Sequence, residues 1–266
     1  MSIAVALAVA IYSGLYTSLW GAFKDSPFET FKAKTFPRSI YFNVVILLVL
    51  YFVPYFGENL RRLGMVQVFF LIMGIERFFA ELYKGFFRTE DQSKYFVPSR
   101  ITFFGRRVQS DLLRFAVGSL IVAGVFSFLL IEVKVSSFAG YLLIAYGTGL
   151  LVALGGAYKD APFEGFKWLK FQRSGLVLAV LSPLFYLLDD PLDPLHVGFL
   201  IYMNGGLERF TIEYYKTFVQ RNMSGKFRPD LQRIQECVDR REKYHYMALA
   251  IVAALAIVYL YEIHVI

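Results

Sequence analysis

This sequence of 266 residues has few charged residues, three histidines and a single cysteine. Only 18% of its residues are charged, against about 25% in ordinary soluble domains, and 57% are hydrophobic. Cys237 alone can form neither an intramolecular disulfide nor a cysteine-based metal cluster, and the histidines are far apart in the sequence. We expect no metal and no cofactor. The composition excludes a disordered chain, a disulfide-rich scaffold and a typical soluble enzyme.

Several catalytic signatures are also missing from the sequence. There is no aspartate-rich diphosphate motif of prenyltransferase type, no paired-aspartate motif of CDP-alcohol transferases, no Walker A loop, no GxSxG elbow and no HExxH. The acidic stretch DDPLD at 189–193 is interpreted as a turn rather than a magnesium site. No Lys or Arg precedes Lys24, so the basic region of a secretory signal peptide is lacking. We interpret Met1–Phe23 as a first membrane span that the mature protein retains.

The chain instead contains long apolar blocks. Five stretches have no Asp, Glu, Lys or Arg: Met1–Phe23, Ser39–Gly57, Phe115–Ile131, Val135–Tyr158 and Met247–Tyr261. A bilayer core of about 30 Å needs about 20 apolar residues per helix. The sequence therefore predicts an all-α fold, a polytopic membrane helix bundle.

Two sequence blocks occur twice in the same order. Residues 21–39 (GAFKDSPFETFKAKTFPRS) and 156–174 (GAYKDAPFEGFKWLKFQRS) are identical at twelve of nineteen positions, at an offset of 135. Residues 74–86 (GIERFFAELYKGF) and 206–218 (GLERFTIEYYKTF) are identical at eight of thirteen positions, at an offset of 132. The identities are mostly charged, Gly, Pro or aromatic residues, which similar apolar helices do not share by chance. The chain is therefore interpreted as a tandem repeat with units 1–136 and 137–266.

Each unit is predicted to contain four hydrophobic helices. The expected ranges are 2–23, 39–56, 65–87 and 112–133, then 137–158, 174–188, 195–218 and 246–264. The sixth is short and contains Pro183, so it is expected to be tilted, re-entrant or broken. Eight spans, four per unit, give both units the same orientation, which is a parallel repeat.

The net charge of +7 indicates orientation rather than nucleic-acid binding, because the charges lie between apolar blocks. The loops 24–38, 88–111, 159–173 and 219–245 fall on one side and hold twenty of the 28 Lys and Arg residues. The positive-inside rule predicts that these loops are cytoplasmic and that both termini lie outside, in the cell membrane. The sequence does not predict the oligomeric state.

The third and seventh predicted helices carry charges where a span should be apolar. Two matched triplets have the spacing i, i+4, i+7 and so share a helix face: Arg77, Glu81, Lys84 and Arg209, Glu213, Lys216. Ionisable groups at membrane depth are costly unless paired, hydrated or near an interface, so these faces should point into the bundle. We expect Arg77 to pair with Glu81, and Arg209 with Glu213.

These charged faces have a structural and a functional interpretation. In the first, the ion pairs clamp helices together without any chemistry. In the second, the arginines line an anionic site, because a guanidinium binds phosphate oxygens bidentately, and a neighbouring carboxylate orients it or moves a proton. Arg77, Glu81, Arg209 and Glu213 are therefore the candidate catalytic residues. Glu76 and Glu208 precede each arginine and point about 100° away from it.

Further cations are candidates for binding a lipid headgroup. They are Lys24, Lys32, Arg38, Lys84, Lys159, Lys167, Arg173 and Lys216. The alternative is plain anchoring to anionic lipid, which needs no special geometry. The repeated KDxPFExF pattern is more specific than anchoring requires.

The order of the blocks resembles the C-terminal part of prolipoprotein diacylglyceryl transferases. Pro27-Phe28-Glu29 and Pro162-Phe163-Glu164 look like a shortened form of that family's H-P-x-x-x-Y-E loop motif. Arg77-Phe78 with Glu81, and Arg209-Phe210 with Glu213, are similar to its R-F-x-x-E-x-x-R motif. The family's H-G-G and G-R-x-G-N-F segments have no counterpart here. That family acts on the outer face of the membrane, whereas the charge distribution here places the motif loops inside. The resemblance implies a related fold and an anionic-lipid site.

Three hypotheses about function follow. The leading one is an integral membrane protein that binds an anionic phospholipid headgroup, in its concrete version a phospholipid-dependent glyceryl transferase with a lipid-modified substrate. The second is a transporter or permeation protein, because repeats with a charged midregion are common in transporters. The third is a non-catalytic membrane scaffold.

Overall fold

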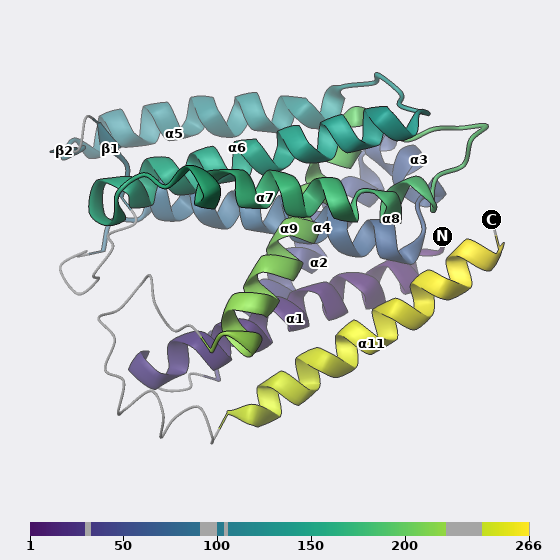
Figure 1. Cartoon of the computed structure of the whole chain (residues 1–266), viewed down its shortest axis with the longest axis horizontal. Helices are drawn as coiled ribbons and strands as arrows, with labels where there is room; N and C mark the ends of the chain where they lie inside the picture. The colour runs from purple at the N-terminus through teal and green to yellow at the C-terminus, as the bar shows by residue number, and fades with distance from the viewer. Residues whose placement is uncertain (30–32, 91–99, 104–105, 222–240, 266) are drawn as a thin grey trace.

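The computed structural model of this chain is almost entirely helical (Figure 1). It describes residues 1–29, 33–90, 100–103, 106–221 and 241–265, with all side chains in these ranges except those of 25–29, 158–164 and 265. The longer helices are α1 (Ile3–Glu29), α2 (Arg38–Phe52), α3 (Pro54–Arg62), α4 (Met65–Leu82), α5 (Asp111–Phe126), α6 (Phe138–Glu164), α7 (Trp168–Leu181), α9 (Val197–Tyr214) and α11 (Glu242–Val265). Short helical segments are η1 (Tyr83–Phe87), η2 (Ser127–Leu130), α8 (Pro183–Tyr186) and η3 (Tyr215–Val219). Strands β1 (Thr102–Phe103) and β2 (Arg106–Arg107) form one small hairpin, so the all-α prediction is confirmed.

The helices run back and forth between two ends of the molecule (Figure 1). One end carries both chain termini and α3, and the opposite end carries the β1–β2 hairpin. α4 and α9 cross in the middle, with α5, α6 and α7 on one side and α1 and α11 on the other. The two termini therefore lie at the same end of the bundle.

Four helices are long and apolar enough to cross a membrane. They contain the stretches Ile3–Lys24, Asp111–Leu130, Phe138–Ala157 and Glu242–His264, and the bent pair α2–α3 makes a fifth if it is one span. Only 11% of the apolar stretch in α11 is buried, against 44% in α1. An apolar helix with so little burial suits a lipid-facing position. The predicted number of eight is larger because α4 and α9 each carry three charged residues within eighteen, and α7, with 14 residues, is too short to span alone.

The centre of the bundle is a close crossing of α4 and α9. A Cβ atom added to Gly74 would lie 1.9 Å from the Tyr202 carbonyl oxygen, and one added to Gly206 would lie 2.0 Å from the Phe70 carbonyl oxygen. The two backbones touch at these glycines, which is how small residues allow membrane helices to approach each other. Most of α4 and α9 is buried, so this crossing forms the core around which the other helices pack.

A second kind of close contact joins neighbouring helices in each half. Gly14 of α1 lies against the backbone of Ser39 and Ile40 at the start of α2, since an added Cβ would meet Ile40 Cα at 2.5 Å. Gly149 of α6 lies in the same way against α7, with Gly175 Cα at 2.5 Å. Both contacts place a repeated serine, Ser39 or its counterpart Ser174, next to the central crossing.

The start of α4 is held by the last helix of the chain. The Glu262 carboxylate of α11 accepts hydrogen bonds from the backbone N–H groups of Met65 (2.5 Å) and Val66 (3.3 Å). These groups have no partner within their own helix, and a carboxylate also suits the positive end of the helix dipole. Gln67 closes the cap by accepting from Gly64 N–H at 2.8 Å. α11 is thereby fixed to the end of α4 that lies farthest from its arginine.

Proline interrupts one helix in each half. The predicted helix 39–56 ends at Phe52, and α3 starts at Pro54 with a bend of 104°. The predicted helix 174–188 begins earlier, at Trp168, and is broken after Leu181, where Pro183 opens α8. Proline is tolerated in the first turn of a helix because its missing N–H has no intrahelical partner there. Of the three alternatives for the sixth helix, the structure shows the broken one.

Candidate functional site: crossed ion pairs between α4 and α9

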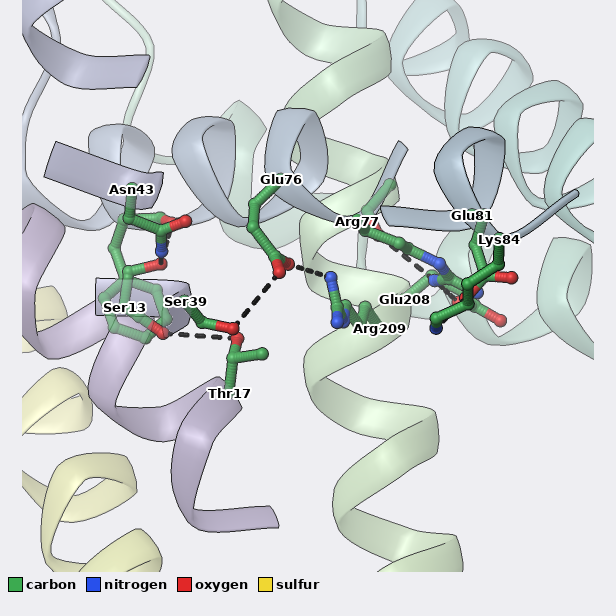
Figure 2. Close-up of polar contacts among 12 residues, drawn as sticks. Ser13, Thr17, Ser39, Asn43, Glu76, Arg77, Glu81, Lys84, Glu208 and Arg209 are labelled. Carbon is green, nitrogen blue, oxygen red and sulfur yellow. Dashed lines mark hydrogen bonds and ion pairs between the residues drawn. The ribbon is translucent and has the colours of Figure 1, made fainter. Parts of the chain in front are cut away.

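The two central arginines form ion pairs across the helix crossing. Arg77 of α4 contacts the Glu208 carboxylate of α9, and Arg209 of α9 contacts the Glu76 carboxylate of α4. Figure 2 shows both pairs beside each other between the two helices. Glu208 and Glu76 are 3% and 6% exposed, and Arg209 is 7% exposed, whereas Arg77 keeps 22%. The pairs are therefore reciprocal, each helix supplying one acid and one base.

This arrangement corrects the expected pairing of Arg77 with Glu81 and of Arg209 with Glu213. An i, i+4 pair needs only one helix, but here a second helix lies within reach because the backbones touch at Gly74 and Gly206. Because the two helices are so close, the buried carboxylate that each arginine contacts belongs to the facing helix. The prediction that these charged faces point into the bundle is confirmed for Arg77 and Arg209 but is wrong for Glu81, which is 50% exposed.

Two repeated serines complete the network. Ser39 Oγ donates to Glu76 Oε1 at 3.3 Å, and Ser174 Oγ donates to Glu208 Oε1 at 2.6 Å. Each buried carboxylate thus binds one arginine from the opposite helix and one serine from α2 or α7 (Figure 2 for Ser39). The sequence analysis missed both serines, although they are the last identical position of the first repeated block.

A second layer of charge lies toward the C-terminal ends of α4 and α9. Glu213, 18% exposed, forms an ion pair with Lys24 of α1, with Nζ and Oε2 3.5 Å apart. Glu81, 50% exposed, accepts from Lys84 Nζ at 2.8 Å. Lys216 interacts electrostatically with Lys24, Arg173 and Glu213. The cations therefore gather around the buried pairs and are not confined to the loops.

The remaining predicted headgroup residues lie farther out or cannot be placed. Arg38 and Lys167 are exposed at the starts of α2 and α7. Lys32 lies outside the described residues, and Lys159 lies among those whose side chains are not described. The structure thus brings together Lys24, Arg173 and Lys216, with Lys84 beside Glu81, and does not bring Arg38 or Lys167 to them.

The cluster carries more positive than negative charge. Glu213 interacts electrostatically with Lys24, Lys216, Arg77 and Arg209, and Arg173 adds a fifth cation. Among the residues whose side chains the structure describes, the carboxylates of this inner group are those of Glu76, Glu208, Glu213 and Glu81, the last of which interacts electrostatically with Arg77. Partly buried cations in excess of their partners favour an anionic ligand. Within the described residues, no group of three or more His, Cys, Asp or Glu is arranged to hold a metal.

The acidic stretch at the opposite end has a structural role. Asp189 accepts from the Tyr141 hydroxyl at 2.6 Å and from Leu195 N–H at 3.1 Å, while Asp193 forms ion pairs with Arg62 and Lys134. The stretch forms a turn, as predicted, in the wall of a cavity of about 1160 Å³. Its carboxylates bind protein donors, so we do not take this cavity as the functional site.

The ion pair between Asp193 and Lys134 predicts a loss of stability in acid. The hydrogen bond from Lys134 holds the pKa of Asp193 below its usual value. A carboxyl whose pKa is lowered on folding stabilises the protein above its unfolded-state pKa of about 3.9, and this contribution is lost as pH falls through the lower folded-state pKa. Thermal unfolding in detergent between pH 7 and pH 3 should therefore show a smaller acid-dependent decrease in Asp193→Asn than in the wild type. Asp190→Asn is the control, because Asp190 accepts from Leu192 N–H rather than from a cation; an unchanged acid dependence in Asp193→Asn contradicts the assignment.

The fold and this cluster define a class: a helical protein with several helices able to cross a membrane, built around a buried network of reciprocal ion pairs. Comparisons with protein-family models, with curated proteins and with solved structures find no match.

Proposed function

We propose that this protein is an integral membrane protein of two tandem four-helix units, with eight spans, that binds an anionic lipid or lipid-phosphate headgroup. The repeated sequence blocks support the duplication, as do the contacts at corresponding glycines and the serine–glutamate bonds at corresponding positions. The basic loops, with the hairpin end of the bundle, face the cytoplasm, and both termini lie outside, as the distribution of Lys and Arg favours.

The excess of partly buried positive charge carries the proposal. Lys216 interacts electrostatically with Lys24 and Arg173, and Glu213 does so with Lys24, Lys216 and both crossed arginines. Each arginine contacts its glutamate through Nη1. A guanidinium has five N–H donors, so Arg77 and Arg209 have further donors for phosphate oxygens. A phosphodiester at this place would balance the surplus charge and accept hydrogen bonds from several donors at once.

In its concrete version the protein is a phospholipid-dependent glyceryl transferase. The resemblance of the R-F-x-x-E motifs to prolipoprotein diacylglyceryl transferases supports this reading, with a lipid-modified substrate as acceptor. Arg77 and Arg209 hold the phosphate, and Glu213, beside Lys24, is the better-placed acid or base because Glu81 is half exposed. A carboxylate in that position can take up the proton of an attacking nucleophile.

One observation favours a transporter as the second candidate. Helices are broken near the same part of both halves, at Pro54 in α2–α3 and at Pro183 in α7–α8, although their offset of 129 differs from the 132 and 135 of the repeated blocks. Transporters often bind their substrates where paired helices are interrupted. Uptake of an anionic solute into proteoliposomes, absent in empty vesicles, would favour this alternative.

A scaffold without ligand remains the third candidate, and it predicts neither transport nor headgroup binding.

Removing one cluster cation should weaken binding of anionic lipid. We expect Lys216→Gln to bind phosphatidylglycerol about ten-fold more weakly, because a charge-assisted hydrogen bond to phosphate contributes about 1.5–3 kcal/mol. Lys243→Gln is the control, since Lys243 is an exposed cation on α11 and its loss reduces only general attraction. Native mass spectrometry or lipid exchange in nanodiscs, with phosphatidylcholine as competitor, measures the affinity. Equal effects of the two substitutions, or no preference of the wild type for phosphatidylglycerol, would contradict the proposal.

Glyceryl transfer that persists in Glu213→Gln would contradict the enzymatic version alone.

A further inference from the structure

At least two donors in the cluster are buried without a partner among the described residues, Arg173 Nε and the indole Nε1 of Trp20. The indole Nε1 of Trp20, near the end of α1, is inaccessible to solvent and has no hydrogen-bond acceptor among the residues whose side chains the structure describes. A buried N–H without an acceptor is costly, and native structures contain few of them. Such a group indicates an acceptor that belongs to a bound molecule or a water.

The surroundings of Trp20 indicate an anionic acceptor. Arg209 Cζ lies 5.3 Å from the centre of the Trp20 ring, and Lys24 Nζ lies 5.7 Å from it. Both cations are held by carboxylates on the neighbouring helices, Arg209 by Glu76 and Lys24 by Glu213. Both cations therefore lie over the indole ring, and an oxyanion bound at the N–H edge of the ring would have them as neighbours.

The corresponding place in the other half has no indole. The offset of 135 aligns Trp20 with Gly155 of α6, where an added Cβ would meet no atom within 4 Å. We call Trp20, Lys24, Arg209 and Glu213 the Trp20 half-site, and Gly155, Arg77 and Glu81 the Gly155 half-site. The two also differ in enclosure, since Glu213 is 18% exposed and Glu81 is 50% exposed. The sequence therefore keeps the arginine and the glutamate at both places but an indole at only one.

We propose that the chain holds one phosphodiester headgroup, in the Trp20 half-site, with the Trp20 Nε1–H donating to a phosphate oxygen. This inference rests on the proposed function and adds to it the number of ligands, their place and a residue that selects them. Trp20 acts here as a specificity residue: its N–H requires an acceptor, which a phosphodiester provides close to the two cations. No second headgroup binds at the Gly155 half-site: its Arg77 pairs with Glu208 and contributes its remaining donors to the single phosphate.

The test compares two conservative substitutions in the full-length protein. Trp20→Phe keeps an aromatic face for Lys24 and Arg209 and removes the N–H donor. Trp168→Phe makes the same chemical change at an exposed position of α7. Native mass spectrometry gives the number of phosphatidylglycerol molecules bound per chain, and titration in nanodiscs gives the affinity. Glycerol phosphate and inorganic phosphate, added without lipid, distinguish a lipid headgroup from a free phosphate.

The inference predicts one tightly bound phosphatidylglycerol per wild-type chain and about ten-fold weaker binding in Trp20→Phe, with no change in Trp168→Phe or in thermal stability. Phosphatidylglycerol binding that is equally tight in Trp20→Phe, or two equivalent lipids per chain, overturns the inference and leaves the proposed function standing. Wild-type protein that does not prefer phosphatidylglycerol overturns both. Binding of free phosphate as tight as that of the lipid keeps the Trp20 site and assigns it to a soluble ligand.

Discussion

Replacement of Arg209 by methionine is expected to destabilise the protein by about 3–5 kcal/mol. The substitution leaves the Glu76 carboxylate 6% exposed, with Ser39 as its remaining partner in the network. A charge buried without its counter-ion costs far more than the pair itself contributes. Unfolding by heat or by SDS in mixed micelles, followed by circular dichroism, measures the effect.

A double variant separates the charge effect from lost packing. Glu76→Gln combined with Arg209→Met removes both charges and keeps an acceptor for Ser39, so it should be more stable than Arg209→Met alone. Arg38→Met serves as the surface control, because Arg38 is exposed, and it should change stability by no more than about 0.5 kcal/mol. Similar stabilities of Arg209→Met and Arg38→Met would contradict the buried ion pair between Arg209 and Glu76.

Alanine at Gly206 is expected to destabilise the protein by about 3 kcal/mol or more, at or beyond the upper end of ordinary overpacking. The new Cβ would lie 2.0 Å from the Phe70 carbonyl oxygen and 3.0 Å from Gly74 N, and both atoms belong to backbone. No rotamer change relieves such a clash, so α4 and α9 must separate, and the two ion pairs lengthen with them. The same unfolding measurements apply.

The neighbouring glycine provides a matched control. A Cβ added to Gly205 would meet no atom within 4 Å, although Gly205 lies in the same helix. Alanine there should leave stability unchanged or raise it by up to about 1 kcal/mol, since alanine favours helix over glycine. Equal stability of the two alanine variants would contradict the close crossing.

The positions of the helices could be predicted from the sequence because apolar runs are a local signal. The range expected for the third helix, 65–87, is occupied by α4 and η1. The break at Pro183 was among the expected alternatives, since proline disrupts the helix ladder wherever it lies. The fold class and the approximate helix positions therefore needed no knowledge of which helices touch, although the helix expected at 174–188 begins at Trp168.

The partners of the arginines could not be predicted in the same way. The spacing of Arg77 and Glu81 is a within-helix pattern, whereas Glu208 reaches Arg77 only because Gly74 and Gly206 bring two backbones into contact. The angle and depth of such a crossing depend on packing over the whole interface. Trp20 was missed for a similar reason, because an unpartnered N–H can be recognised only once its surroundings are known.

The reciprocal pairs can form only after both α4 and α9 have been synthesised. Arg77 and Glu208 are 131 residues apart in the chain, and Glu76 and Arg209 are 133 apart. At about 5–20 residues per second, α4 exists for roughly 7–26 seconds before α9 has been made. During that interval its buried acid and base have no partners from the second half, and they must be held by water, by each other or by the insertion machinery. Synthesis of α9 therefore ends this interval, and a chain that stops before α9 leaves Glu76 and Arg77 without these partners.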